Sequence, residues 1–329
     1  MRLTALKVLE VLKSESDKNH PLTLQKIADK LAEKFDSTGN STRGNRHTVR
    51  AYIEALQESD YPIVRTSRGY YLEPDFEDSE LRMLIDSVLF SNLPHDTAKN
   101  FIEKLKKLGN KRFKPKVRHV YNLSSLKHSD NEQIMNSIDV ISDAISTHKK
   151  ISFVYSNYGT DFKLHPRRDK PYKISPFQMV TANSRYYLIA NTDGHDNISH
   201  YRIDRMTDVK MLDEPARELL NQNNPITDFV GNLNLPKHMA EHVYMFSGKS
   251  IRVKFWTYEF MMNCLVDWFG KDFHILKNQD DRILIEVTVN EHAIKYWIMQ
   301  FGEFVEVVMP VTLREEICKT AEKIMNAHS

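Results

Sequence analysis

Apolar residues in the first third of the chain recur every three or four positions, which is the period of an α-helix with one buried face. This pattern predicts amphipathic helices over residues 2–14, 24–35 and about 45–59. Two short runs with apolar period two follow, at residues 63–66 and 70–72, on either side of the turn signal Ser67-Arg68-Gly69. The first 73 residues therefore predict three helices and a two-stranded hairpin.

Three helices and a hairpin, in this order, are typical of a winged helix-turn-helix, whose third helix enters the major groove of DNA. On the third helix Val49, Ile53 and Leu56 face inward, which leaves basic and polar residues on the outer face near the helix start. Guanidinium groups there suit guanine edges and phosphates. The candidate DNA contacts are Arg43, Asn45, Arg46, His47, Thr48, Arg50, Tyr52, Arg65 and Arg68. A small protein-interaction module is the alternative, because the same helical spacing fits both.

The apolar period changes along the rest of the chain. Residues 77–109 predict a helical connector broken at Pro94, and residues 131–148 predict one further helix. From Lys150 the period becomes two, and five or six short strands up to residue 212 predict a small barrel or a strongly bent sheet. From about residue 243 the order strand, helix, strand, strand, helix, strand and a trailing helix predicts a ferredoxin-like sandwich.

The chain is thus predicted to be a multidomain α+β protein, and its 329 residues suit two or three domains. The expected parts are a winged helix-turn-helix (1–75), a helical connector (76–130), a small barrel (131–213), a linker (214–242) and a ferredoxin-like domain (243–329). No apolar run reaches the ~18 residues that span a bilayer. No signal peptide is visible, and the two cysteines exclude a disulfide framework. We therefore expect a cytoplasmic protein without membrane contact.

Charge is unevenly distributed, although the net charge is only +2. Residues 99–118 contain nine Lys or Arg and one acid, and residues 163–173 contain five and one. Such basic blocks suggest local contact with phosphate. A solvated helix face with a basic linker is the alternative for the first block.

Motifs of known catalytic chemistry are missing from the sequence. It contains no GxGxxG, Walker A, HExxH or GxSxG pattern. His238 and His242 have the HxxEH spacing of inverted zinc peptidases, but no third ligand is evident and a short polar helix explains the pattern equally well. A nuclease would need clustered acids, for which Asp161, Asp169 and Asp204 are scattered candidates. We therefore predict no enzyme, no catalytic residue, no cofactor and no metal.

Three segments in the middle of the chain carry a resemblance to a known family. They are Pro-Tyr-Lys-Ile-Ser-Pro-Phe-Gln at 171–178, Arg-Tyr-Tyr-Leu-Ile-Ala at 185–190 and His-Tyr-Arg-Ile-Asp-Arg-Met at 200–206. They strongly resemble the WYL domain of bacterial transcriptional regulators, with Tyr186 in place of the tryptophan that begins the family's Trp-Tyr-Leu motif. The resemblance extends nearly end to end. Such regulators often carry an N-terminal winged helix, a WYL domain with an Sm-like barrel and a ferredoxin-like C-terminal extension.

The third predicted helix also resembles its counterpart in the family. Thr48-Val49-Arg50 and Ile53 look like the Thr-Ile-Arg core of the family's recognition helix. Tyr52 stands where many relatives have an acidic residue, which puts fine base contacts in doubt.

The resemblance implies a dimeric DNA-binding regulator, with the C-terminal extension as the dimerisation domain. It would bind a palindromic double-stranded operator and repress its own or a neighbouring operon, often beside phage-defence genes. A nucleotide or single-stranded nucleic acid in the WYL domain would modulate operator affinity. The alternative is a nucleotide-sensing or nucleic-acid-sensing adaptor that reads no operator. The sequence gives neither the operator, the ligand nor the sign of regulation.

The same resemblance implies the ligand site. Its candidate residues are Tyr155, His165, Arg167, Tyr186, Tyr187, His200, Arg202 and Arg205. Guanidinium groups suit phosphate, and tyrosine rings can stack on bases. Two alternatives remain open, namely that the tyrosines fill the barrel core and that Arg202 pairs with a carboxylate.

Overall fold

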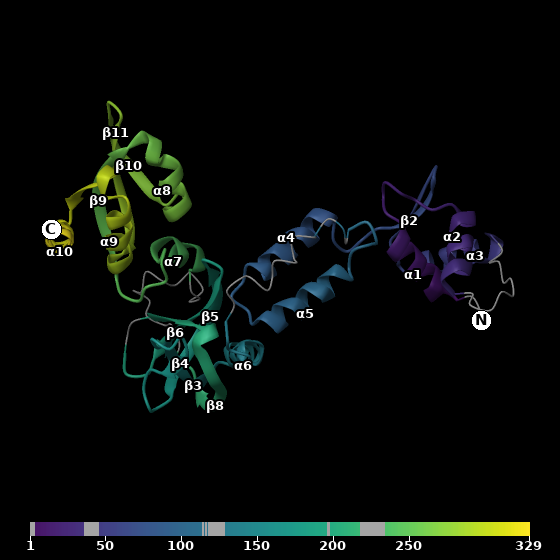
Figure 1. Cartoon of the computed structure of the whole chain (residues 1–329), viewed down its shortest axis with the longest axis horizontal. Coiled ribbons are helices and arrows are strands. Elements are labelled where there is room, and N and C mark those ends of the chain that lie inside the picture. The colour runs from purple at the N-terminus through teal and green to yellow at the C-terminus, as the bar shows by residue number, and fades with distance from the viewer. Residues whose placement is uncertain are drawn as a thin grey trace. The chain divides into compact units, whose positions relative to one another are not determined.

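A computed structural model describes residues 4–35, 46–113, 115, 117, 129–195, 198–217 and 234–329 of the chain (Figure 1). The chain separates into two compact units, residues 1–130 and 131–329. Within the described ranges, no helix is both long enough and apolar enough to cross a membrane.

The first unit begins with three helices and a hairpin, as the apolar spacing predicts. The elements are α1 (Ala5–Glu15), α2 (Leu24–Phe35), α3 (Arg46–Glu58), β1 (Ile63–Thr66) and β2 (Gly69–Leu72). The three helices share one core, to which α1 contributes Val11 and Leu12, α2 contributes Ile27, and α3 contributes Val49 and Ile53, all 0% exposed. The hairpin strands are antiparallel and are joined by an exposed turn at Ser67 and Arg68, whereas Tyr70 of β2 packs into this core.

The hairpin is fixed to the segment before α2 at a position that only glycine can occupy. Gly69 has φ +138°, and a Cβ there would lie 2.4 Å from the carbonyl oxygen of Leu22. The next residue, Tyr70, exchanges two backbone hydrogen bonds with Leu22, at 2.7 and 2.8 Å. Close backbone approach therefore requires the glycine.

A helical hairpin completes the first unit. It consists of α4 (Asp78–Leu89) and α5 (His95–Lys106), which lie side by side in Figure 1. Their facing residues Leu81, Ile85 and Ile102 form a second core together with Phe113. A capping box between Glu77 and Glu80 begins α4, as expected for a helix start that must satisfy its free N–H groups.

The second unit begins with α6 (Ile134–Ser146), which packs against a curled antiparallel sheet. The strands are β3 (Lys149–Tyr158), β4 (Leu164–Pro166), β5 (Tyr172–Ala182), β6 (Arg185–Thr192), β7 (Ile198–Arg202) and β8 (Met206–Pro215). Their order is β4-β3-β5-β6-β7, and β8 also pairs with β3. One long strand thus has three partners, and its register shifts against β8 bend it. A mixed α/β chain with a helical start and a curled sheet is therefore confirmed.

A short helix, α7 (Leu235–Glu241), precedes the last part of the second unit. That part contains β9 (Ser250–Tyr258), α8 (Met262–Phe269), β10 (Phe273–Gln279), β11 (Arg282–Asn290), α9 (Glu291–Gln300), β12 (Glu306–Met309) and α10 (Val311–His328). The four strands are antiparallel in the order β10-β11-β9-β12. Alternate residues of β9 and β11, such as Phe255 and Ile285, pack against Leu265 of α8 and Trp297 of α9. Both helices therefore contribute to one core with this sheet.

Candidate nucleic-acid and ligand sites

The first turns of α3 present an exposed basic face. Arg46, His47, Thr48 and Arg50 are exposed, whereas Val49 between them is fully buried. The Arg46 Nε donates a 2.6 Å hydrogen bond to Oε1 of Gln25, which is a neutral partner.

Arg50 has a charged partner instead. Its Nε lies 2.9 Å from Oε1 of Glu54, one turn later on the same helix. The hydrogen bond that Arg50 donates to this carboxylate is the main cause that raises the pKa of the Arg50 guanidinium. An exposed pair of this kind contributes little to stability, so phosphate can replace Glu54 as the partner of Arg50 at little cost.

The tip of the hairpin presents two further arginines. Arg65 and Arg68 are exposed, and within the described part of the chain neither pairs with a carboxylate. The turn itself is ordered by Thr66, whose hydroxyl donates to the Gly69 carbonyl at 3.1 Å and accepts from the Arg68 N–H at 3.2 Å. Tyr52 is half-buried and packs on the helical core. Arg43 and Asn45 lie outside the described residues.

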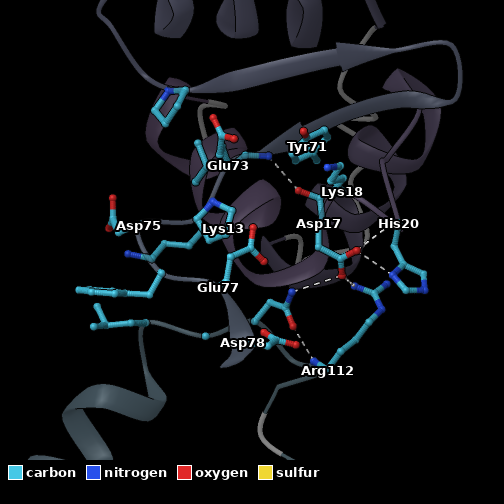
Figure 2. A pocket seen from close by; sticks show the side chains of 18 of the residues that line it. Lys13, Asp17, Lys18, His20, Tyr71, Glu73, Asp75, Glu77, Asp78 and Arg112 are labelled. Atoms are coloured by element: carbon cyan, nitrogen blue, oxygen red, sulfur yellow. Dashed lines mark hydrogen bonds and ion pairs between the residues drawn. The ribbon is translucent and has the colours of Figure 1, made fainter. Parts of the chain in front are cut away.

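A hollow of about 570 Å³ lies beside α1 in the first unit (Figure 2). Figure 2 shows Asp17 on its wall, with its carboxylate directed toward His20 and Arg112. The distances are 2.8 Å to the His20 Nδ1 and 3.2 Å to the Arg112 Nη1. Burial alone would raise the pKa of Asp17, but the hydrogen bonds from His20 and Asn19 outweigh it and hold this pKa below its usual value.

A second carboxylate next to this hollow is also bound by cations. Glu15 at the end of α1 pairs with Lys30 at 3.0 Å and with Lys111. Burial acts to raise the pKa of Glu15, but the hydrogen bonds and charges of these two lysines lower it overall. Two members of the basic block at 99–118, Lys111 and Arg112, therefore connect the three-helix module to the helical hairpin.

In the second unit an aromatic cluster fills the curled sheet. The rings of Phe153, Tyr155, Tyr172 and Tyr201 have centroids 5.2–6.2 Å apart. Tyr155 is 8% exposed, and burial raises the pKa of its hydroxyl. This hydroxyl accepts a 3.3 Å hydrogen bond from the Arg202 backbone N–H. Tyr155 therefore packs in the core of the curled sheet, which is the alternative stated above for the tyrosines.

Arg202 forms a two-bond ion pair with Asp204. The Nε–Oδ1 distance is 3.0 Å and the Nη2–Oδ2 distance is 2.7 Å. Burial alone would lower the pKa of Arg202, but the hydrogen bonds and charge of Asp204 raise it. Pairing with a carboxylate, which was the alternative for this residue, is what the structure shows. Arg205 is half-buried, and its Nε has no hydrogen-bond partner among the described residues.

The other candidate ligand residues divide between two places. Tyr187 is half-exposed and lies opposite Arg202 across the β6–β7 ladder, with Tyr186 next to it. His165 and Arg167 are exposed on and after β4, where His165 Nε2 lies 2.9 Å from Asp161. The structure therefore brings Tyr155, Tyr187 and Arg202 together. The exposed β4 residues adjoin them along the backbone, because the Arg167 N–H donates to the Tyr155 carbonyl at 2.8 Å.

One neighbour of this site and one contact were not predicted from the sequence. The neighbour is Arg168, which stacks on Tyr172 with its guanidinium carbon 3.5 Å from the ring centroid; only the basic composition of residues 163–173 pointed to it. The contact is that of His200, a predicted ligand residue, with His238, whose Nε2 atoms lie 2.7 Å apart. No local pattern connects two histidines on separate elements.

Comparisons with known proteins identify two domains. The WYL domain model matches residues 136–211, and the WCX domain model matches residues 250–325. No curated protein matches the sequence. Similar solved structures include proteasome accessory factor B/C (PafBC) of Arthrobacter aurescens, with 13% identity and a TM-score of 0.31 over 96% of this chain and 48% of that one. They also include a CRISPR Cas-related protein, with 16% identity and a TM-score of 0.39 over 100% of this chain and 87% of that one.

The chain spans about half the length of PafBC. Since both TM-scores are low, neither structure fixes the fold or the function of this chain.

Proposed function

We propose that this chain, which contains a WYL domain and a WCX domain, is a DNA-binding transcription regulator. In this proposal the three N-terminal helices and the hairpin form a winged helix-turn-helix that binds duplex DNA. The last part of the second unit, with its order of strands and helices, is a ferredoxin-like domain that pairs two copies of the chain. We assign no catalytic role to any residue.

One observation carries the proposal. A single small module exposes four arginines on two neighbouring elements, Arg46 and Arg50 on the first turns of α3 and Arg65 and Arg68 on the hairpin. The apolar residues of the same elements are buried. A helix start that carries cations, next to a hairpin that carries more, suits a major groove and the adjoining backbone phosphates.

The finer parts of the proposal concern regulation. A symmetric dimer would place two such modules on the half-sites of a palindrome, about one helical turn apart or a multiple of it. A nucleotide or single-stranded nucleic acid at Tyr187, Arg202 and Arg205 would change operator affinity, and we expect repression of its own or a neighbouring operon. A tenfold change in affinity needs only about 1.4 kcal/mol of differential binding.

Fluorescence anisotropy tests the DNA-binding part directly. The full chain would be titrated into labelled duplex DNA taken from immediately upstream of its own gene, with a scrambled duplex for comparison, at several salt concentrations. We expect nanomolar binding with a clear preference for the natural duplex. Each phosphate contact should contribute a slope of roughly −0.9 to the plot of log affinity against log salt.

Paired variants assign this binding to the module. Arg46→Ala with Arg50→Ala should weaken binding and reduce the preference over the scrambled duplex. Arg65→Ala with Arg68→Ala should weaken binding to both duplexes equally and make the plot of log affinity against log salt less steep. Arg82→Ala on α4 is the matched control, because it removes an exposed arginine from outside the module. Equal binding of both duplexes by every variant would instead favour the adaptor that reads no operator.

A further inference from the structure

Three histidines from separate parts of the chain meet in the second unit. His238 lies on α7, His242 follows one turn later, and His200 lies on β7. The Nε2 atoms of His200 and His238 are 2.7 Å apart. One ligand nitrogen from each of the three rings lies within 4.8 Å of the others. These three residues are called the histidine cluster below.

Two of the three rings in the histidine cluster are buried and His200 is half-buried, which makes the cluster unlike a chance group of surface side chains. His238 is 2% exposed and His242 is 4% exposed, and their rings stack with centroids 4.1 Å apart. Buried polar atoms are normally hydrogen-bonded. Here the Nδ1 atoms of both His200 and His238 are buried without a hydrogen-bond partner among the described residues.

Hydrogen bonds alone satisfy this cluster poorly. Between two neutral imidazoles only one N–H···N bond can form, so His200 and His238 share one bond and each leaves its other nitrogen unsatisfied. Buried nitrogens without a partner destabilise a fold. A cation bound at the Nε2 atoms would accept the lone pairs of both rings, where the metal-free rings share a single hydrogen bond.

The protonation states suit such a cation. Burial, followed by the charges of the neighbouring rings, lowers the pKa of His200 to about 2 and that of His238 to about 3. Burial also lowers the pKa of His242. Hydrogen bonds to the backbone of His238 and Gly248 and the negative charge of Glu241 act to raise this pKa, but burial outweighs them. Burial therefore favours the neutral form of these rings, and neutral imidazole is the form that binds a metal.

The orientation of His242 is also that of a metal ligand. Its Nδ1 lies 2.9 Å from the carbonyl oxygen of His238. Because a carbonyl only accepts, this Nδ1 carries the proton and the Nε2 keeps its lone pair. A backbone carbonyl that fixes the tautomer in this way is the usual support of a ligating histidine.

We propose that His200, His238 and His242 bind one divalent transition-metal ion of the zinc class. Zn²⁺ is known to bind tetrahedrally to three imidazoles, with the fourth coordination position taken by water or another group. Ligand nitrogens in such a site are about 3.3 Å apart when the Zn–N bonds are ~2.0–2.1 Å. The distances in the cluster bracket this value, so small side-chain rotations would complete the site. The carboxylate of Glu241, beside His242, would offset part of the charge of the ion.

The position of the site indicates what the ion does. His200 lies within the WYL match, whereas His238 and His242 lie between the WYL and WCX matches, in a segment that neither covers. A bound ion would fasten α7, the helix that precedes the WCX match, to β7 of the curled sheet. It would therefore join the part of the chain that the WYL model matches to the part that the WCX model matches.

Metal titration of the full chain tests the proposal. The protein would be stripped with a chelator and titrated with Zn²⁺ in competition with a chromophoric chelator, and metal content would be measured by mass spectrometry. We expect about one Zn²⁺ per chain and a rise in melting temperature when the metal is added. Co²⁺ in place of Zn²⁺ should give the intense visible absorption of a four-coordinate ion.

Variants separate this site from adventitious binding. His200→Gln and His242→Gln should each weaken Zn²⁺ binding by roughly a hundredfold or more. His274→Gln is the matched control, because it removes an exposed histidine from β10. Circular dichroism of the stripped variants shows whether they fold. Unchanged affinity in the cluster variants overturns the proposal. If these variants fail to fold, wild-type protein that takes up no stoichiometric Zn²⁺ or gives a six-coordinate Co²⁺ spectrum overturns it.

Discussion

The ion pair between Arg202 and Asp204 can be tested by replacing Asp204 with asparagine. Asparagine keeps the volume and one acceptor oxygen of the side chain, so the change removes mainly the negative charge. The Asp204 side chain is 3% exposed and that of Arg202 is 17% exposed. The substitution therefore leaves a largely buried guanidinium without its counter-charge.

The size of the effect follows from this burial. Removing one partner of a buried ion pair costs about 3–5 kcal/mol, and the partial exposure of Arg202 favours the lower end, about 3 kcal/mol. For a unit of this size, 1 kcal/mol corresponds to about 2–4 °C in melting temperature. Asp204→Asn should therefore lower the melting temperature of the second unit by about 6–12 °C.

Differential scanning calorimetry measures this shift, and tryptophan emission identifies the transition, because Trp256, Trp268 and Trp297 all lie in the second unit. Asp208→Asn is the matched control, since Asp208 is exposed and has a positive φ that asparagine tolerates. A shift no larger than in this control would refute the reasoning. In that case Arg202 would be available to a ligand without competition from Asp204.

Two further predictions concern the first unit. Glu15 and Asp17 have pKa values below their ordinary 4.5 and 3.8, so the stability they contribute is present above those values and is lost as pH falls through the lower, folded-state values. On acidification from about pH 5, the melting temperature of the wild type should fall more than that of the double variant Glu15→Gln, Asp17→Asn. Parallel plots of melting temperature against pH for the two proteins would contradict this. Gly69→Ala should cost at least about 2 kcal/mol, because its Cβ would meet the Leu22 carbonyl at 2.4 Å and its φ is +138°. Gly270→Ala, with φ +65° and open space around it, should cost less in the same thermal melts, and an equal loss would refute the clash.

Much of the fold could be predicted because its signals are local. The apolar period of residues 2–14 gives α1 to within a few residues, and the predicted strands at 63–66 and 70–72 correspond to β1 and β2. The predicted helix at 131–148 is longer than α6, and the reason is a tertiary contact. The Asn131 side chain donates to the carbonyls of Asp204 and Met206 at 3.1 and 2.7 Å, so it anchors the helix start and does not join the helix.

The candidate sites were less predictable, because their partners come from distant positions. The pairing of Arg202 with Asp204 could be anticipated, since the two residues are two positions apart. His200 could not be connected with His238, because only the packing of α7 against β7 brings them together. A basic block likewise shows where cations lie along the chain, but the acids that bind Lys111 and Arg112 come from the end of α1 and the residues after it.

The partners of the cations, more than their number, decide which surface of this chain suits phosphate. Lys111 and Arg112 come from the most basic segment of the sequence, yet both are held by carboxylates of their own unit. Arg202 is held in the same way within the curled sheet, so a phosphate there must displace a nearly buried carboxylate. Arg65 and Arg68 pair with no carboxylate in the described part of the chain, and a phosphate can meet them at no such cost. Phosphate replaces an exposed carboxylate partner of an arginine at little cost in free energy, but replacing a buried one costs much more. The hairpin and the start of α3 should therefore supply most of the salt dependence of DNA binding.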